Sequence, residues 1–382
     1  MTEHDHATEH ECRACRRPAG EVVLDLGEQP ACDHFPGVDE PGPDPVHPLQ
    51  MWLCSSCGLA QLLTDPTGPE EPRGAEPAAL VEQAADAVAR VAAAGWLPAG
   101  ARVAEYGSPH GGSWSQPLAE RGAVLVDEPE PADVVLDCFG LMHASDQAAA
   151  LAARGDRVAH GGVLLLQYHS LATIVRLGQW NSLRHGHFAY YSTTALTAML
   201  AAAGFSPRTA WTFGLYGGTV LLASTRDRDR DGAAGADQSV RDLLADETSL
   251  GVSDPRRLRR LQRTAVTHAE SLHGWLVAQH DAGRSVLGYG AASRAVALLC
   301  RAGIDRGLLP AVADASPAKQ GRRMPATDIP VISPERLVAA GPDVVLLFLP
   351  DLLAEVRSAL PEVEGAGGRW VDVDDLRSDP AP

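Results

Sequence analysis

Two histidines one residue apart, His185 and His187, stand just before three aromatic residues in the segment LRHGHFAYY. Imidazole can act as a general base, contact a substrate or coordinate a metal, so the pair marks a candidate site. Residues at i and i+2 do not share a face of a helix, whereas in an extended segment they point to the same side. No acidic residue lies between Gly178 and Ser192 to complete a metal site. The pattern therefore favours a catalytic or substrate-binding pair over a metal centre.

Four of the seven cysteines fall into two CxxC pairs. Each CxxC turn presents two thiolates, and two such turns can close a tetrahedron around zinc. Closing the long loop between the pairs costs about 3 kcal/mol of entropy, against roughly 10–16 kcal/mol gained from structural zinc. The pattern predicts a closed, structural zinc site; a redox pair of metal-free thiols is the alternative. The predicted ligands are Cys12, Cys15, Cys54 and Cys57.

The composition limits the class of protein. The 382 residues carry a formal net charge of −17 and are 45% apolar, which suits several domains with apolar cores. A nucleic-acid-binding face would be basic, so no nucleic-acid partner is expected. No apolar run has the length of a membrane span, no signal peptide is recognisable, and the scattered remaining cysteines suit a reducing compartment. We expect a cytoplasmic protein without a membrane partner, monomeric or weakly oligomeric.

These candidates must be positioned by alternating strands and helices. Strand candidates in the middle of the chain lie at 101–107, 123–127, 133–139, 162–168 and 218–224, and those near its end at 285–290, 311–315, 343–349 and 370–374. Helical segments separate the strands, which predicts an α/β fold with two parallel, doubly wound Rossmann-like units. Breaker-rich and charged segments mark the boundaries. The predicted parts are a tail and zinc-binding module (1–66), a middle domain (67–225), a charged hinge with a helical segment (226–281) and a C-terminal domain (282–382).

The strand ends of the middle domain carry further candidates. The first strand candidate leads into a Gly-rich turn with Glu105, Gly107 and Gly111, where backbone N–H groups could approach a ligand. Asp127 ends the next strand candidate, where an acid could bind ribose hydroxyls; an ordinary strand-end aspartate is an equal alternative. His143 follows a third strand candidate and so stands at the edge where α/β sheets bind ligands.

The C-terminal part adds two observations. Lys319 is the single lysine of an arginine-rich chain, which indicates either a required compact ammonium or a chance surface lysine. Gly288 and Gly290 follow a strand candidate, and Asp314 ends the next, which resembles a dinucleotide-binding fingerprint without its third glycine. A redox role is therefore one open hypothesis.

The order of these motifs resembles the nucleotide-sugar C-methyltransferases of deoxysugar biosynthesis, most closely the type that methylates carbon 3 of dTDP-4-keto-6-deoxyhexoses. The resemblance spans roughly 12–373 and rests on the two CxxC pairs, the Gly-rich turn, HGHFAYYS, YGGT, GYGAAS and KQGRRMP. It implies a zinc-binding domain, a class I methyltransferase domain and a C-methyltransferase C-terminal domain, with S-adenosylmethionine as methyl donor and a nucleotide sugar as substrate.

The resemblance also implies roles for individual residues. It makes His187 the base that removes a proton beside the ketone, with His143 as a second active-site histidine and His185 as a positioning residue. The residues implied to bind S-adenosylmethionine are Glu105, Gly107, Gly111 and Asp127. The residues implied to bind the sugar nucleotide are Tyr289, Gly290, Lys319 and Arg322.

The chain departs from that family at several places. Gly186 stands where the family has glutamate between the histidines, and Arg184 stands where tyrosine is common. The family's Tyr-rich stretch after the zinc module is replaced by the segment 67–77. Only residues 128–132 separate two strand candidates where the family has a further helix and strand, so we expect a shortened methyltransferase domain.

These departures leave two alternatives to methyl transfer. The first is a cofactor-independent epimerase or isomerase, in which His187 and His143 would remove and return a proton beside the ketone. The second is a sugar-nucleotide binder that has lost its chemistry at Gly186.

Overall fold

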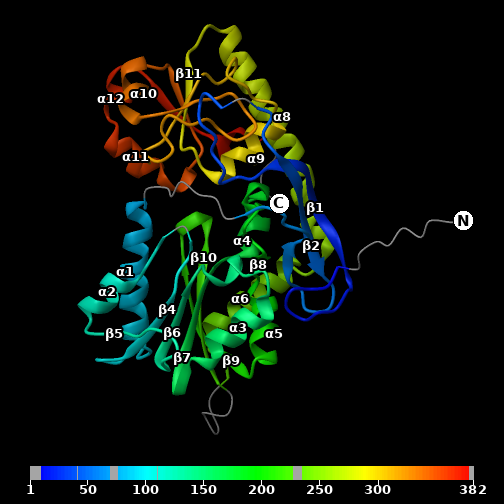
Figure 1. The fold of residues 1–382 in the computed structure, drawn as a ribbon, viewed down its shortest axis with the longest axis vertical. Coiled ribbons are helices and arrows are strands. Elements are labelled where there is room, and N and C mark those ends of the chain that lie inside the picture. Colours follow the sequence, from blue (N-terminus) through cyan, green and yellow to red (C-terminus); the bar gives the residue numbers. More distant parts are fainter. Residues whose placement is uncertain (1–9, 41, 69–75, 110, 227–234, 378–382) are drawn as a thin grey trace, which may run out of the picture.

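The computed structural model describes residues 10–40, 42–68, 76–109, 111–226 and 235–377. These residues form three sheets: one associated with the cysteines, one in the middle domain and one in the C-terminal domain (Figure 1). The N-terminal tail, most of the breaker-rich segment 67–77 and most of the charged hinge lie outside the described residues. Within the described part of the chain, no helix combines the length and apolar character needed to cross a membrane.

The N-terminal sheet joins segments that are far apart in the sequence. Its antiparallel order is β1-β2-β3-β8. The strands are β1 (Gly20–Pro30), β2 (Val46–Cys54), β3 (Ala60–Leu62) and β8 (Ala189–Tyr190). β3 follows the second CxxC pair, whereas β8 follows His187, and Ala60 and Tyr190 are direct partners in the ladder. The cysteine module and the histidine segment are therefore parts of one sheet.

The middle sheet has the order β5-β4-β6-β7-β10-β9. Its strands are β4 (Arg102–Tyr106), β5 (Val124–Leu125), β6 (Ala132–Cys138), β7 (Val158–His169), β9 (Phe205–Phe213) and β10 (Thr219–Arg226). The first four in sequence are parallel as expected, but β10 runs antiparallel to β7 and β9. Only the short helix η3 (Leu215–Gly217) joins β9 to β10, and so short a connection requires antiparallel pairing. The sheet is mixed rather than purely parallel.

Helices cover both faces of the middle sheet. One face packs against α1 (Ala78–Ala93) and α2 (Ser115–Glu120), and the other against α3 (Gln147–Asp156), α5 (Thr193–Ala202) and α6 (Gln238–Leu250). α1 carries an apolar stripe at helical spacing that includes Leu80, Ala84, Val88 and Val91. Ser192 caps the start of α5, since its side chain accepts a hydrogen bond from the amide of Ala195.

The edge of the middle sheet is cut short, as the sequence predicted. β5 has two residues, and residues 126–131 between β5 and β6 contain no helix and no strand. Val124 and Leu125 are consequently 53% and 46% exposed. The further helix and strand expected of the resembling family are absent from this described segment.

The C-terminal sheet is parallel throughout, with the order β13-β12-β11-β14-β15. Its strands are β11 (Val286–Tyr289), β12 (Val312–Ala313), β13 (Val331–Ile332), β14 (Val344–Leu347) and β15 (Arg369–Asp372). The surrounding helices are α9 (Ser293–Arg301), α10 (Pro334–Ala340), α11 (Leu353–Ala359) and α12 (Glu362–Gly365). This domain confirms the second Rossmann-like unit.

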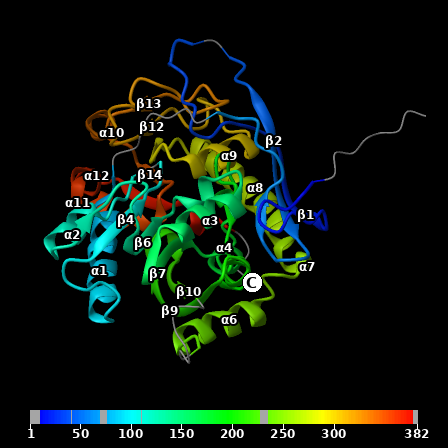
Figure 2. The same cartoon turned by 60° about the horizontal axis from the view of Figure 1, so that its bottom comes forward.

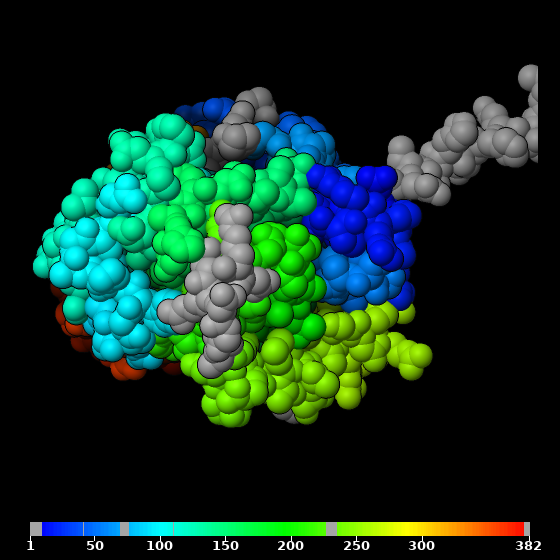
Figure 3. Space-filling model, turned by 90° about the horizontal axis from the view of Figure 1, so that it is seen from below, coloured from blue at the N-terminus to red at the C-terminus, as the bar shows by residue number. Residues whose placement is uncertain are grey.

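One apolar core joins the N-terminal ribbon to the C-terminal domain. β1 packs against α7 (Pro255–Leu258) and α8 (Arg260–Asp281), which run alongside it in Figure 2, and against α9. Leu24 and Leu26 of β1 belong to the same buried cluster as Leu261 of α8 and Leu298 of α9. Seen from below, the N-terminal module, the middle domain and α6 share one continuous surface (Figure 3).

Candidate active site

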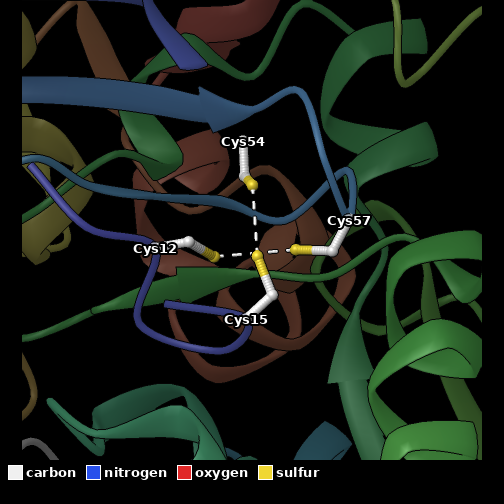
Figure 4. Close-up of side chains that lie close together, drawn as sticks. All are labelled: Cys12, Cys15, Cys54 and Cys57. Atoms are coloured by element: carbon white, nitrogen blue, oxygen red, sulfur yellow. Dashed lines mark hydrogen bonds between the residues drawn. The ribbon is translucent and has the colours of Figure 1, made fainter. Parts of the chain in front are cut away.

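The four paired cysteines form a single cluster. Their sulfur atoms all lie within 4.8 Å of one another, and the Sγ–Sγ distances of Cys12–Cys57 and Cys15–Cys54 are both 3.6 Å (Figure 4). The hydrogen bond between Cys12 and Cys57 lowers the pKa of Cys12 and raises that of Cys57, because the two thiols compete for one proton. Four converging sulfur ligands at this spacing fit tetrahedral zinc with no position left for a substrate. The structure therefore brings the four predicted ligands together, and their binding of zinc stays a prediction.

A cavity of about 340 Å³ lies between the middle and C-terminal domains. It is framed by the carboxyl ends of β6 and β7 on one side and of β11, β12 and β14 on the other, with Asp33 of the N-terminal module on its wall. This is the edge at which parallel α/β sheets bind ligands. His143 and His187 both line the cavity, whereas His185 does not.

The two histidines of the HGH segment point to different places because the chain turns at Gly186. Gly186 has a φ of 80°, a left-handed conformation that favours glycine over a side chain such as glutamate. The ring of His185 lies against His47, and its Nε2 is 3.3 Å from the carbonyl of Pro48. The expected extended geometry with a shared face is therefore wrong. Gly186 has a structural reason to be glycine.

Arg184 holds His187 in a defined state. Its Nε donates to Nε2 of His187 over 2.8 Å, so this nitrogen accepts and the imidazole is neutral. The rings of His143 and His187 lie edge to face with centroids 4.7 Å apart. His143 Nδ1 is 2.9 Å from the carbonyl of Gly186, which requires the proton on Nδ1. Burial, followed by the charge of Arg184, lowers the pKa of His143 to about 4. His143 is therefore neutral near pH 7, and His187 is neutral while Arg184 donates to it.

The histidine segment is fixed from two directions. The amide of Gly186 donates to Oδ2 of Asp65, the residue that closes the cysteine module, over 2.5 Å. The amide of Phe188 donates to the carbonyl of Met142 in η1 (Leu141–His143) over 2.7 Å. Residues of the zinc-binding module therefore help to set the position of His187.

A third histidine, which was not predicted from the sequence, lies on the cavity wall. His169 ends β7 and lies near Tyr216, with ring centroids 6.5 Å apart, and Tyr216 in turn packs on Phe139 at 6.1 Å. Phe139 and Tyr216 have φ values of 58° and 56°, conformations that side chains rarely adopt and that often occur at functional sites. The sequence could have indicated His169, because a polar residue at the carboxyl end of a buried parallel strand stands where ligands bind.

We expect the buried state of His169 to make stability depend on pH. Burial and the charge of Arg294 lower the pKa of His169 to about 3, whereas an unfolded histidine titrates near 6.5. Between these values the unfolded chain binds more protons, so the contribution to stability is present above pH 6.5 and is lost as the pH falls. From pH 7 to pH 5, the free energy of unfolding should fall about 1–2 kcal/mol less in His169→Asn than in the parent.

Urea unfolding followed by tryptophan fluorescence at pH 7, 6 and 5 measures this difference. His280→Asn, at an exposed position near the end of α8, is the control and should keep the parent's pH profile. Equal pH profiles for His169→Asn and the parent would contradict the assignment.

The structure brings part of the predicted methyl-donor turn to the cavity. Ser108 and Gly111 line the cavity, whereas the carboxylate of Glu105 accepts hydrogen bonds from the amide of Trp114 and the hydroxyl of Ser113. Gly107 is not on the cavity wall, and Asp127 is exposed on the shortened edge. Gly111 has a φ of 100° and presents backbone without a side chain. Of the four residues implied to bind S-adenosylmethionine, the structure therefore places only Gly111 on the cavity wall.

The four residues implied to bind the sugar nucleotide also divide into two that line the cavity and two that do not. Tyr289 and Lys319 line the cavity, and Nζ of Lys319 donates to the carbonyl of Ala291 over 2.7 Å. Gly290 is not on the wall, and the exposed Arg322 donates to the carbonyl of Phe35, joining the C-terminal domain to the N-terminal module. Arg294, which the sequence analysis did not single out, lines the cavity with its guanidinium over the ring of Tyr216 at 5.5 Å.

Comparison with known families matches the chain along nearly its whole length. A zinc binding domain matches residues 12–71, a methyltransferase domain 78–210 and a C-methyltransferase C-terminal domain 214–373. The chain belongs to the C-methyltransferase family. Its three parts follow the order that the sequence analysis expected of such an enzyme.

A curated relative of this family member is the C-methyltransferase NovU of Streptomyces niveus. The two are 26% identical over 242 residues, which are 61% of this chain and 54% of NovU, so the chain spans about half the length of the relative it matches.

Among solved structures, the magnesium protoporphyrin IX methyltransferase of Synechocystis PCC 6803 is 18% identical to this chain, with a TM-score of 0.30. The match covers 39% of this chain and 84% of the Synechocystis chain. The CcbJ methyltransferase of Streptomyces caelestis is 14% identical, with a TM-score of 0.29. The match covers 38% of this chain and 89% of the CcbJ chain. Similarity at this level carries no conclusion about substrate.

Proposed function

We propose that this family member transfers a methyl group from S-adenosylmethionine to a carbon beside the ketone of a nucleotide-linked 4-keto-deoxysugar. The observation that carries the proposal is a single cavity that receives the Gly-rich turn after β4, two neutral histidines and the strand ends of the C-terminal domain. Its volume of about 340 Å³ is within the usual range for small-molecule sites.

The chemistry requires a base and a place for negative charge. A ketone acidifies the neighbouring C–H bond, so removal of that proton gives an enolate carbon nucleophile, and S-adenosylmethionine supplies an electrophilic methyl group. A positioned imidazole base contributes roughly 10²–10⁴-fold. We assign the base to His187, with His143 against its ring as the second acid–base group. Arg184, whose charge lies at Nε2 of His187, is suited to stabilise negative charge formed beside it.

On the substrate side, Tyr289 and Lys319 are the proposed contacts to the nucleotide diphosphate. Both lie on the wall contributed by the C-terminal domain. Lys319 offers a compact ammonium for phosphate oxygens, with one of its protons donated to Ala291. Gly290 and Arg322 are not on the wall, so their proposed contribution is to hold this wall in place.

One observation favours a second candidate function. The shortened edge beside β5 and the exposed position of Asp127 reduce the surface available to the adenosine part of a methyl donor. A cofactor-independent epimerase would need only proton removal and return at the same histidines.

A keto-sugar nucleotide incubated in D2O, with and without S-adenosylmethionine, separates the two functions. Under the proposed function, deuterium enters beside the ketone and a methylated product forms when the donor is present. Inversion or exchange with no methylated product under any donor concentration would select the epimerase.

Replacing Gly111 with alanine should weaken binding of S-adenosylmethionine by about tenfold or more. A Cβ at a φ of 100° forces the turn to rearrange, and this turn is the part that lines the cavity. Titration calorimetry measures the change. Gly122→Ala is a matched control, because Gly122 also has a left-handed φ (75°) but is not on the cavity wall. Equal losses in both variants would exclude a specific role for the turn.

A further inference from the structure

Two arginines face the histidine end of the cavity from opposite domains. Arg184 belongs to the segment between η2 (Trp180–Ser182) and β8, and Arg294 is the second residue of α9. Among the described residues, neither guanidinium forms an ion pair with a carboxylate. The polar partner of Arg184 is His187, and Arg294 lies over the ring of Tyr216.

This arrangement is electrostatically unfavourable without a ligand. Burial lowers the pKa of Arg294, the charge of Asp351 offsets part of this effect, and the charge of Arg184 lowers the pKa again. An enclosed cation needs a counter-ion or water to replace its hydration. An anion between the two guanidinium groups would relieve both the desolvation and the mutual repulsion.

Among the described residues, no acidic residue on the wall forms an ion pair with either arginine. Most accept hydrogen bonds from protein donors elsewhere: Asp33 from the hydroxyl of Ser293, Glu76 from the amide of Gly112, and Asp314 from the amides of Ala291 and Ser316. Glu355 is 3.5 Å from the amide of Ala78. Asp351 is the acid whose charge acts on Arg294, but it forms no ion pair with it.

We propose that Arg184 and Arg294 together bind an anionic oxygen group of the substrate, and that this group is a carboxylate on the sugar. The proposal rests on the proposed function and narrows its substrate class to an acidic keto-sugar. The position favours the sugar over the pyrophosphate, because Arg184 contacts His187, the residue assigned to the reacting carbon. Planar guanidinium groups match the two oxygens of a carboxylate.

Binding of the carboxylate would also change the state of His187. Arg184 donates to Nε2 of His187 in the structure, and this nitrogen carries the lone pair that a base needs. A carboxylate that accepts from Arg184 in place of Nε2 would release this lone pair while the guanidinium stays beside His187. The acidic group would then serve both recognition and activation of the base.

Titration calorimetry with UDP-glucuronate, UDP-glucose and inorganic pyrophosphate tests the site without methyl donor or turnover. The two sugar nucleotides differ by a carboxylate in place of a hydroxymethyl group. Wild-type protein should bind UDP-glucuronate about tenfold more tightly or better, because a buried charge-assisted contact is lost with UDP-glucose. Arg184→Gln and Arg294→Gln should each abolish this preference, while Arg306→Gln, which removes an exposed arginine of the same domain, should retain it.

The other outcomes are equally distinct. If both sugar nucleotides and pyrophosphate bind the wild type equally and weaken equally in Arg184→Gln and Arg294→Gln, the two arginines hold the diphosphate, and the proposal of a sugar carboxylate is overturned. Binding unchanged in both variants, or no binding of any of the three compounds to the wild type, would overturn the proposal. Because no turnover is involved, failure of methyl transfer leaves this result intact.

Discussion

Replacing Cys54 with serine should abolish zinc binding and unfold the N-terminal sheet. Cys54 ends β2, is buried, and contributes one of four sulfur ligands. Structural zinc contributes roughly 10–16 kcal/mol to folding, far more than a small ribbon of strands can replace. We expect about one zinc per chain in the parent and none in the variant, with a large fall in thermal midpoint and in soluble yield.

Loss of zinc in Cys54→Ser should also disturb the position of His187 on the cavity wall. β3 follows Cys57 and pairs with β8, and Asp65 holds the amide of Gly186, so loss of the zinc module removes supports of His187. Metal analysis by mass spectrometry and deuterium exchange of the substrate are the two measurements. Cys300→Ser is the control: Cys300 lies outside the cluster and donates to the carbonyl of Pro325. A Cys54→Ser protein that retains one zinc per chain would refute the site.

Replacing His187 with asparagine should lower the rate of proton exchange beside the ketone by about 10²–10⁴-fold. Asparagine can still accept from Arg184, so the fold and the position of the guanidinium should be preserved. The loss should occur with and without S-adenosylmethionine, because proton removal precedes methyl transfer.

His185→Asn provides the matched comparison for this experiment. His185 is buried two residues away but lies against Pro48 and His47, outside the cavity wall. We expect its exchange rate to stay within a few-fold of the parent. If the substrate exchanges its proton as fast with His187→Asn as with the parent, the base is another group. The variants His143→Asn and His169→Asn then test which histidine it is.

The sequence was most informative where chemistry depends on local spacing. Two CxxC turns and a doubly wound pattern of strands specify a cysteine cluster and Rossmann-like domains, since thiolate geometry and hydrophobic periodicity are short-range properties. The five residues between two strand candidates likewise predicted the shortened edge, because they are too few for a helix and a strand. These expectations agree with the structure.

The sequence was least informative where one residue reverses the chain. The left-handed φ of Gly186 sends His185 toward Pro48 and His187 toward the cavity, and neither direction follows from the spacing of the pair. β9 was missed because Pro207 and Arg208 interrupt its apolar pattern, although it pairs along the whole of β10.

The contacts made by Arg184 and Arg294 could not be predicted either, because they depend on residues far apart in the sequence. They join a cavity wall built from residues more than a hundred positions apart. In sequence, Arg294 is one arginine among many, and Arg184 stands out only as a departure from the tyrosine of the resembling family. What distinguishes them is a place on the cavity wall without an ion-paired carboxylate in the described part of the chain, which exists only after the domains have packed together.

The packing of β1 on the C-terminal helices has a consequence for the nascent chain. Arg301 of α9 donates to the carbonyl of Leu26 across 275 residues, and Leu24 and Leu26 share their core with α8 and α9. At usual elongation rates of about 5–20 residues per second, the ribbon of β1 and β2 emerges from the ribosome on the order of tens of seconds before its covering helices exist. During that interval an apolar face and an unpaired strand edge are available to neighbouring ribbons on a polysome. Translation speed between the second CxxC pair and α9, and the chaperones that hold such edges, should therefore govern how much of this protein is recovered in soluble form.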